Sequence, residues 1–361
     1  MSLVFNCPLN SVSFGQVSTA LLREAYEREM DFLIAKIGDK LDLSSQQTEP
    51  EFFKKLEQSA RDFSVKFDRS DSCFKLWHLN GAIGWLADNQ TLMTFYELDD
   101  PTDLEINIVK NCRKVIFTSE FTRDLFNSKG LDTKYVPLFF DKHNFKKIKR
   151  EEYDDNRIVF NLCGKFEFRK HHSKIISAWV KKYGNNKKYL LQCAVYNPFF
   201  DKNANAECIS SSLNYQRYYN TTFLSHLPKN QDYNKFLNSS DVIIGMSGGE
   251  GWGLPEFHSL ALGKHAVLLN AHAYKSWANE SNAVLVEPSS KVDCVDGKFF
   301  HKGQEYNQGQ IFDWKEDDFI DACEEAIKRV EASRENTEGL KLQDEFTVGR
   351  TLDGILDVVN Q

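Results

Sequence analysis

Gly248-Gly-Glu-Gly-Trp-Gly-Leu-Pro-Glu-Phe-His-Ser-Leu-Ala-Leu-Gly263 is the stretch that decides the fold, and it follows the apolar run Asp241-Val-Ile-Ile-Gly245. A short apolar run predicts a buried strand, and a glycine-rich turn lets the backbone approach a ligand closely. Pro255 suits the first turn of the helix that follows, and a helix behind such a loop presents free N–H groups to an anion. The stretch therefore predicts a strand, a binding loop and a helix, although taken alone it also fits a tight structural turn.

Strand and helix patterns alternate on the N-terminal side of this stretch. Apolar spacing predicts an amphipathic helix over residues 17–37, and the polar residues 44–72 predict a helix plus a loop. A second helix is expected over residues 120–128, with Ser119 as its N-cap. The predicted strands of this part are 3–6, 74–79, 91–96, 114–119 and 135–139. The charged segment 142–156 is the best candidate for a linker.

A second alternation begins after that segment. Its predicted strands are 158–163, 189–195, 222–224, 241–245 and 265–269, and its predicted helices are 173–183, 318–330 and 347–359. Residues 201–220 are polar and predict an irregular insertion. Strands that alternate with helices form parallel sheets covered by helices, and such sheets bind ligands beyond the carboxyl ends of their strands. The sequence therefore predicts an α/β protein with two doubly wound domains.

Composition excludes several classes of function. The chain has 361 residues and a formal net charge of −7, which argues against bulk electrostatic binding to nucleic acid. Its eight cysteines form no CxxC pair, so we interpret them as small buried thiols rather than zinc ligands. No apolar run approaches the ~20 residues of a spanning helix, and no signal peptide is evident. We expect a cytoplasmic protein without a strong membrane signal.

A basic loop follows the strand predicted over residues 158–163. It reads Gly164-Lys-Phe-Glu-Phe-Arg-Lys-His-His172, and its cations are Lys165, Arg169 and Lys170. Fixed cations at a strand end suit a diphosphate, because charge-assisted hydrogen bonds are about twice as strong as neutral ones. Taken alone, the loop also fits a solvated basic turn. Its position about eighty residues before the glycine stretch favours the binding interpretation.

Together, these two stretches resemble the donor-binding signatures of retaining glycosyltransferases of the GT-B fold (group 1, family 4-like), the sucrose-synthase-like and mannosyltransferase-like superfamily. The family pattern is an acid, Gly, an aromatic residue and Gly-Leu-Pro, then a second acid eight positions after the first; residues 250–255 match it in order. The resemblance implies two Rossmann-like domains with a cleft between them. We expect an acceptor-side domain over 1–150, a donor domain over 151–340 and a C-terminal helix, 341–361, that packs back on the first domain.

The resemblance also assigns roles on the donor side. It implies that Glu250 contacts the sugar hydroxyls and that Lys165 and Lys170 hold the diphosphate as catalytic cations. His258 stands where the family has the acid that binds the ribose, and a histidine offers one hydrogen bond there instead of a bidentate pair. The remaining residues implied to bind the donor are Gly164, Arg169, Gly251, Trp252, Gly253 and Leu254.

Three residues of the first domain are candidates for the cleft. Glu97, in Thr94-Phe-Tyr-Glu-Leu-Asp-Asp100, follows a predicted strand in the way many family members carry a glutamate there. Gly15 occupies the place of a family glycine loop near the donor phosphates and the acceptor, and His78 ends another strand. The alternatives are a surface acid near a turn for Glu97 and a structural histidine for His78.

The predicted function is that of a hexosyl-type, nucleotide-sugar-dependent glycosyltransferase that retains the anomeric configuration. Its acceptor is a carbohydrate, a lipid-linked sugar or a small molecule. No cofactor besides the donor and no metal are expected, because the acids at 99–100 and 316–318 fit solvated turns. Two alternatives remain: a nucleotide-sugar epimerase or hydrolase of the same architecture, and a catalytically silent GT-B-fold binding protein.

Overall fold

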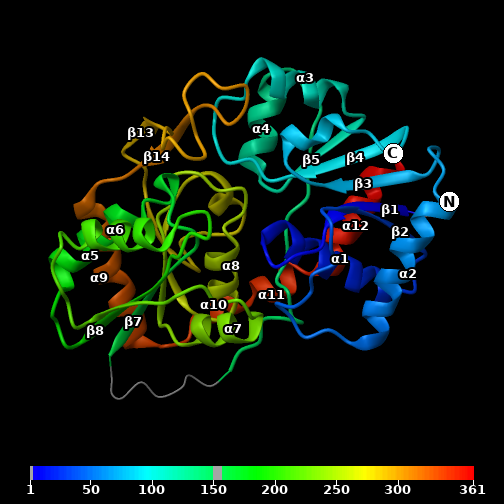
Figure 1. Cartoon of the computed structure of the whole chain (residues 1–361). Coiled ribbons are helices and arrows are strands. Elements are labelled where there is room, and N and C mark those ends of the chain that lie inside the picture. The colour runs from blue at the N-terminus through cyan, green and yellow to red at the C-terminus, as the bar shows by residue number, and fades with distance from the viewer. Residues whose placement is uncertain (1–2, 149–156) are drawn as a thin grey trace.

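Two six-stranded sheets, each entirely parallel, form the two halves of the molecule. The structure is a computed structural model that describes residues 3–148 and 157–361 (Figure 1). The first sheet has the order β2-β1-β3-β4-β5-β6 and the second the order β12-β11-β10-β7-β8-β9. Both orders reverse direction beside the first strand of the sheet, which is the pattern of doubly wound α/β domains. The two predicted doubly wound domains are confirmed.

The first domain contains β1 (Leu3–Pro8), β2 (Phe32–Ile37), β3 (Ser72–Leu76), β4 (Asn89–Thr94), β5 (Lys114–Phe117) and β6 (Lys134–Tyr135). Its helices are α1 (Ser13–Glu27), α2 (Pro50–Lys66), α3 (Asp103–Asn111) and α4 (Glu120–Ser128). Helix α4 has the predicted bounds, and the Ser119 hydroxyl caps it by accepting from the Thr122 N–H at 3.2 Å. This capping satisfies one of the N–H groups that a helix start leaves free.

The helix predicted over residues 17–37 was wrong in its second half. Helix α1 ends at Glu27, and Glu29 adopts a left-handed backbone conformation with φ 55°. Residues 32–37 then form β2, which pairs in parallel with β1 from Leu3↔Phe32 onward. The first four residues of β2 are buried, so pairing and burial in the sheet decide the conformation of this apolar segment.

The second domain contains β7 (Ile158–Cys163), β8 (Tyr189–Ala194), β9 (Thr221–Phe223), β10 (Val242–Gly245), β11 (His265–Leu269) and β12 (Val284–Val286). Its helices are α5 (His172–Tyr183), α6 (Lys202–Ser212), α7 (Asn230–Asn238), α8 (Leu254–Ala261), α9 (Glu316–Ala332), α10 (Thr337–Leu340) and α11 (Leu342–Glu345). The irregular insertion predicted over residues 201–220 was wrong, because it contains α6. The Asp201 side chain caps α6 by accepting from the Ala204 N–H at 2.8 Å.

The chain crosses between the domains twice. Residues 142–148 of the predicted linker contact both domains: His143 Nε2 lies 2.8 Å from the Gln47 carbonyl oxygen of the first, and the Asn234 side chain of the second accepts from the Lys146 N–H at 3.1 Å. Residues 149–156 lie outside the described part. The last helix, α12 (Val348–Asn360), returns to the first domain and packs on α1 and on the sheet (Figure 1). There the Thr351 hydroxyl donates to the Pro137 carbonyl at 2.9 Å.

A segment that the sequence did not predict as strands bridges the two domains. Residues 287–313, called the strap below, carry the antiparallel pair β13 (Ser290–Asp293) and β14 (Gln310–Asp313). The strap reaches from the second domain toward α3 and the end of β4 (Figure 1). Two residues of the strap contact the Asp99 carboxylate of the first domain. Lys291 Nζ lies 2.6 Å from one carboxylate oxygen, and the Gln310 N–H donates to the other at 2.7 Å.

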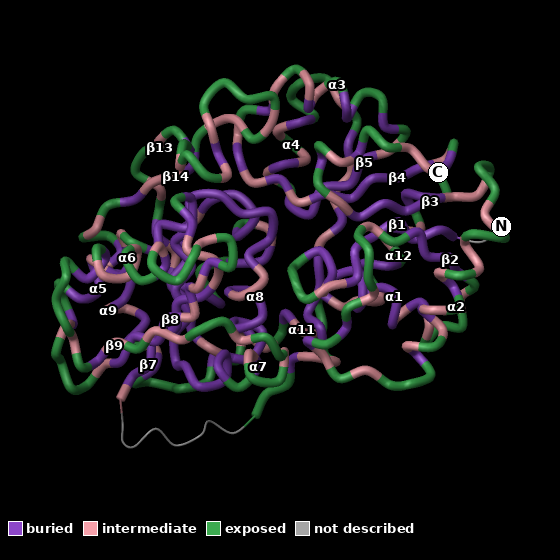
Figure 2. The backbone as a smooth tube through the Cα atoms, viewed as in Figure 1, coloured by how far each residue is buried: buried purple, intermediate pink, exposed green. Residues whose placement is uncertain are grey.

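The strands of both sheets are largely buried, as Figure 2 shows. Among the described residues, no helix combines the length and the apolar character needed to cross a bilayer.

Candidate active site

Two loops meet at the carboxyl edge of the second sheet. The basic loop, residues 164–170, leaves β7, and the glycine loop, residues 246–253, leaves β10. These strands are neighbours, with Ile244 paired to Leu162 near their ends. The order of the sheet reverses here, since β8 lies on the other side of β7. In doubly wound sheets this reversal opens the crevice where ligands bind.

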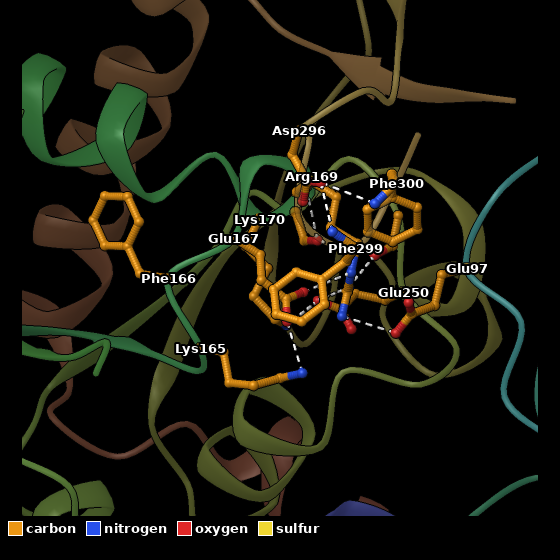
Figure 3. Close-up of polar contacts among 12 residues, drawn as sticks. Glu97, Lys165, Phe166, Glu167, Arg169, Lys170, Glu250, Asp296, Phe299 and Phe300 are labelled. Carbon is orange, nitrogen blue, oxygen red and sulfur yellow. Dashed lines mark hydrogen bonds and ion pairs between the residues drawn. The ribbon is translucent and has the colours of Figure 1, made fainter. Parts of the chain in front are cut away.

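Six charged residues form one connected group at this edge, which we call the acid–base cluster (Figure 3). The Lys170 amine donates to Glu250 Oε1, and Arg169 Nη1 lies 3.2 Å from the same oxygen. Arg169 Nε lies 3.0 Å from Glu167 Oε2, and Lys165 Nζ lies 2.7 Å from Glu167 Oε1. Glu97 completes the cluster from the first domain, with Oε1 2.8 Å from Arg169 Nη2. The cluster therefore contains three cations and three carboxylates and has no net charge.

Burial strengthens these interactions, because charges removed from water are poorly screened. The side chains of Arg169, Lys170 and Glu250 are only 5%, 8% and 7% exposed. Burial alone raises the pKa of the Glu250 carboxyl, but the charges of Lys170 and Arg169 outweigh it and hold this pKa at about 2. Burial likewise disfavours the charged Lys170, yet Glu250 raises the pKa of that amine above its ordinary value. The pair is therefore ionised at neutral pH.

Lys165 and Glu97 are the most open members of the cluster. The Lys165 side chain is 41% exposed and that of Glu97 is 32% exposed. The protein around Glu97 still removes enough water to raise the pKa of its carboxyl, although Arg169 opposes the shift. His78 lies exposed across the cleft from Lys165, and its pKa is lowered by desolvation and then by the Lys165 charge. Lys165 is thus the cation that an incoming anion reaches first.

The glycines of the glycine loop are required by contacts within the protein. A Cβ on Gly249 would lie 2.5 Å from the Glu97 carbonyl oxygen, and one on Gly251 would lie 2.7 Å from Phe95 Cβ. A Cβ on Gly248 would lie 2.4 Å from the Phe312 carbonyl oxygen of the strap. The close approach predicted from these glycines is therefore made by the first domain and the strap. In this closed arrangement they cover the loop.

Helix α8 begins at the end of the glycine loop. Gly253 precedes it with φ 83°, a left-handed conformation that favours glycine, and Pro255 occupies its first turn as predicted. Leu254 starts the helix. The Trp252 side chain points away from the cleft into the core, where it packs 5.3 Å from the Phe257 ring and 5.7 Å from the Phe346 ring. The Trp252 side chain is therefore not available to a ligand, and its carbonyl oxygen accepts from the Trp277 Nε1–H at 3.0 Å.

His272 fixes the glycine loop from the η3 turn (His272–Ser276). Its Nε2 contacts the Gly248 carbonyl, and its Nδ1 lies 3.4 Å from the Glu250 N–H. These contacts require a neutral ring with the proton on Nε2, and burial lowers the pKa of His272 to about 4. The sequence carried no signal for this role, because His272 lies beyond the next strand and outside any motif.

The structure places His258 away from the acid–base cluster. Its ring packs 4.2 Å from the Phe145 ring and 5.7 Å from the Phe140 ring, on the segment that crosses between the domains. Burial lowers its pKa to about 4, so the ring is neutral at physiological pH. Nε2 is buried without a hydrogen-bond partner among the described residues. The ribose contact implied for His258 stays a prediction.

Sequence reasoning missed two carboxylates. Glu167 links Lys165 to Arg169, and its alternation with them along the basic loop is a signal that was present in the sequence. Glu256 lies buried in the first turn of α8, near the Tyr274 side chain, and neither its Oε2 nor the Tyr274 hydroxyl has a hydrogen-bond partner among the described residues. Burial raises the pKa of Glu256 to about 7, against the opposing charge of Lys170.

The first-domain face of the cleft is aromatic. The Phe14 ring stacks on the Phe95 ring at 4.2 Å and lies 4.6 Å from the His78 ring. Gly15 lies beside Phe14 in the first turn of α1, where an added Cβ would lie 2.3 Å from the Asn10 carbonyl oxygen. Gly15 therefore allows the loop before α1 to fold against the helix. Of the first-domain candidates, Glu97 touches the cluster, His78 is exposed beside the Phe14 ring, and Gly15 is buried in the first turn of α1.

No cluster of acidic, histidine or cysteine side chains that could hold a metal ion occurs within residues 3–148 and 157–361.

Comparison with solved structures identifies the fold. HepE from Anabaena, crystallised in complex with UDP-glucose, superposes with a TM-score of 0.64 at 13% identity, over 100% of this chain and 99% of HepE. Sucrose-phosphate synthase from Thermosynechococcus elongatus gives a TM-score of 0.60 at 14% identity, over 99% and 95% of the two chains. A trehalose-6-phosphate synthase from Burkholderia multivorans gives 0.63 at 11% identity, over 100% and 98%. The chain therefore has the GT-B fold, with two Rossmann-like domains.

No family model and no curated protein matches the chain by sequence.

Proposed function

We propose that this chain is a glycosyltransferase that takes a sugar from a nucleoside-diphosphate donor held on its second domain. The observation that carries the proposal is the acid–base cluster. Lys165, Arg169 and Lys170 stand with Glu250 at the reversal point of the second sheet, on the face that meets the first domain. HepE, which shares the fold, was crystallised with UDP-glucose, so this donor is the first to try.

The cluster supplies the chemistry that such a transfer needs. When the bond between the sugar and the diphosphate breaks, negative charge develops on the leaving phosphate. Fixed cations stabilise that charge more in the transition state than in the bound donor, which lowers the barrier. Glu250, ionised and fixed by Lys170, is positioned to accept hydrogen bonds from sugar hydroxyls. Retention of the anomeric configuration and a hexose donor belong to the same proposal and derive from the sequence resemblance.

Donor binding requires an exchange of partners. In this structure the carboxylates of Glu97, Glu167 and Glu250 occupy the cations that a diphosphate would contact. Glu97 belongs to the first domain, so its departure from Arg169 separates the domains at this point. A diphosphate then replaces Glu97 on Arg169 and extends to Lys165. The strap and the first domain open for this step, because they cover the glycine loop.

A thermal-shift screen against nucleoside diphosphates and nucleotide sugars tests donor binding. A ligand at about 100 times its dissociation constant stabilises the folded chain by roughly 2.7 kcal/mol, which raises the melting temperature measurably. We propose that the donor is the only ligand required, so the shift should persist with EDTA and should not increase with Mg²⁺. No shift with any nucleotide would contradict the proposal.

Substitutions then connect binding to transfer. Lys165→Ala should weaken donor binding and slow sugar transfer, since it removes the most accessible cation. Lys181→Ala is the matched control, because Lys181 lies in an exposed ion pair with Glu316 on the surface of the same domain. The anomeric configuration of the product, measured by NMR, tests retention.

One observation favours a second candidate, a binding protein that does not transfer sugar. His258 is buried between two aromatic rings, and its side chain does not reach the cluster. Such a protein would show the thermal shift with nucleotides but would release no nucleoside diphosphate from a bound nucleotide sugar, with or without candidate acceptors.

A further inference from the structure

An aromatic pair lies at the open end of the acid–base cluster. Phe199, in the loop after β8, and Phe299, in the strap, meet edge to face with ring centroids 5.5 Å apart. Lys165 Nζ lies 5.3 Å from the Phe199 centroid and 5.4 Å from the Phe299 centroid. The Phe199 side chain is largely uncovered, since the residue is 57% exposed. Figure 3 shows Phe299 beside Arg169 and above Lys165.

Both rings stand on loops that hydrogen bonds hold in place. The buried Asn197 side chain accepts from the Phe199 N–H at 3.0 Å and donates to the Phe166 carbonyl at 3.0 Å, which ties this loop to the basic loop. In the strap, one carboxylate oxygen of Asp296 accepts from the N–H groups of Phe299 and Phe300, each at 2.8 Å. The exposed ring of Phe199 therefore has a defined place beside Lys165.

The order of contacts in the cluster gives the direction in which a donor would lie. Glu250 stands at one end, Arg169 and Glu167 follow, and Lys165 with the two rings stands at the other end. A nucleotide sugar has the sugar on one side of its diphosphate and the nucleoside on the other. With the sugar at Glu250 and the diphosphate on the cations, the nucleoside extends toward Phe199 and Phe299.

We propose that Phe199 and Phe299 form the stacking platform for the nucleobase of the donor. This inference rests on the proposed function and adds its base-binding side chains. An exposed aromatic face binds the flat face of a base, and such stacking contributes about 1–3 kcal/mol per base in proteins that bind single-stranded nucleic acid. Phe199 stands on a loop of the second domain, like the cations, so its ring stays with the diphosphate site when the domains separate, whereas Phe299 stands on the strap and completes the platform in the closed arrangement. The alternative occupant of the two rings is the sugar of the acceptor.

The experiment compares two probes, UDP and inorganic pyrophosphate, by calorimetric titration of the whole chain. Phe199→Ala should weaken UDP binding about tenfold and leave pyrophosphate binding within about twofold, because only UDP carries a base. Phe199→Trp should restore UDP binding. Tyr215→Ala is the matched control, since Tyr215 is a 71% exposed aromatic residue of the same domain that lies outside both the basic loop and the glycine loop.

Each outcome decides the inference. Equal losses for UDP and pyrophosphate would show that the ring acts through Lys165, and unchanged UDP binding with a raised acceptor KM would place an acceptor sugar there. Either result overturns the platform while leaving the proposed function intact. A wild-type chain that binds neither probe nor any nucleotide sugar overturns the proposed function and the platform together.

Discussion

The two faces of the cleft are built from different kinds of side chain. The second-domain face presents Lys165, Arg169 and Lys170, each paired with a carboxylate. The first-domain face carries rings in place of charges: the exposed His78 ring lies 4.6 Å from the buried Phe14 ring, which stacks on the half-buried Phe95 ring. Charges in fixed positions select a ligand by its charge and geometry, whereas rings contact flat apolar surfaces of many ligands. Under the proposed function, we expect donor recognition to be mainly electrostatic and acceptor recognition to depend mainly on shape.

The comparison predicts its largest effect for Lys170 on the charged face. Lys170→Ala leaves Glu250 buried with Arg169 as its remaining partner. Breaking a buried pair by removing one partner destabilises a protein by about 3–5 kcal/mol. We also expect transfer to fall by roughly 10²–10³-fold, the loss seen when one stabilising group is removed from a developing anion. Urea denaturation and initial rates measure the two effects.

A double substitution separates these effects. Lys170→Met combined with Glu250→Gln removes both charges, so it should recover most of the stability lost in Lys170→Ala and none of the activity. Recovery of activity would show that the pair has only a structural role. His78→Ala, on the ring face, is the matched comparison and should change the free energy of unfolding by less than about 1 kcal/mol, as surface substitutions usually do.

Glu256 provides the second test, because its pKa is displaced in the opposite direction from that of Glu250. Burial raises the pKa of Glu256 from 4.5 to about 7. Between these values the unfolded chain releases the proton while the folded chain keeps it, so this group lowers stability as pH rises from about 4.5 to 7. Glu256→Gln removes the titration. Its stability relative to the wild type should therefore increase between pH 5 and pH 8, by an amount on the order of 1–3 kcal/mol.

Glu250 affects stability in a different pH range from Glu256. Its pKa is held at about 2, so its contribution to stability is complete above 4.5 and is lost only as pH falls from 4.5 toward 2. Melting temperatures of wild type and Glu256→Gln at pH 5 and pH 8 suffice, because the other titrating groups affect both chains alike. A difference that is constant or falls with pH would show that Glu256 is ionised throughout this range.

The difference between the charged face and the aromatic face also explains what the sequence could and could not predict. Lys165, Lys170 and Glu250 lie in two short loops that follow strands, and strand ends bring such loops together, so their convergence was predictable. The aromatic face combines residues from α1 and from the ends of β3 and β4. Gly15 and His78 were expected in the cleft, but no sequence signal linked the Phe14 and Phe95 rings to His78. The strap was missed because its pairing is stabilised by distant contacts such as Lys291 with Asp99. Residues 17–37 were predicted as one helix because the apolar residues of α1 and β2 together fit helical spacing. Only four residues separate the end of α1 at Glu27 from the start of β2 at Phe32.

Substitution of Glu97 should change UDP affinity by a smaller amount. Glu97 is the one carboxylate of the cluster that the first domain supplies. Glu97→Gln weakens the contact with Arg169 and leaves that guanidinium with Glu167 and Glu250. A diphosphate then competes with one carboxylate fewer, so UDP should bind about three- to tenfold more tightly, a gain of roughly 0.6–1.4 kcal/mol. Weaker UDP binding in this variant would show that Glu97 contacts the donor itself. Calorimetric titration measures the change.

The smallest effect is expected for substitution of His78. The informative quantity is the change in the KM for the acceptor relative to the change in the KM for the donor. Among the described residues His78 has no hydrogen bond to the cluster, and desolvation, followed by the charge of Lys165, lowers its pKa, so the ring is neutral above pH 7. His78→Asn should leave UDP affinity within about twofold, because no charge is lost near the diphosphate. If the ring face binds the acceptor, the KM for the acceptor should rise several-fold while the KM for the donor stays constant. Steady-state rates with each substrate varied in turn measure both constants. A larger change in the donor constant would contradict the division between a charged donor face and an aromatic acceptor face.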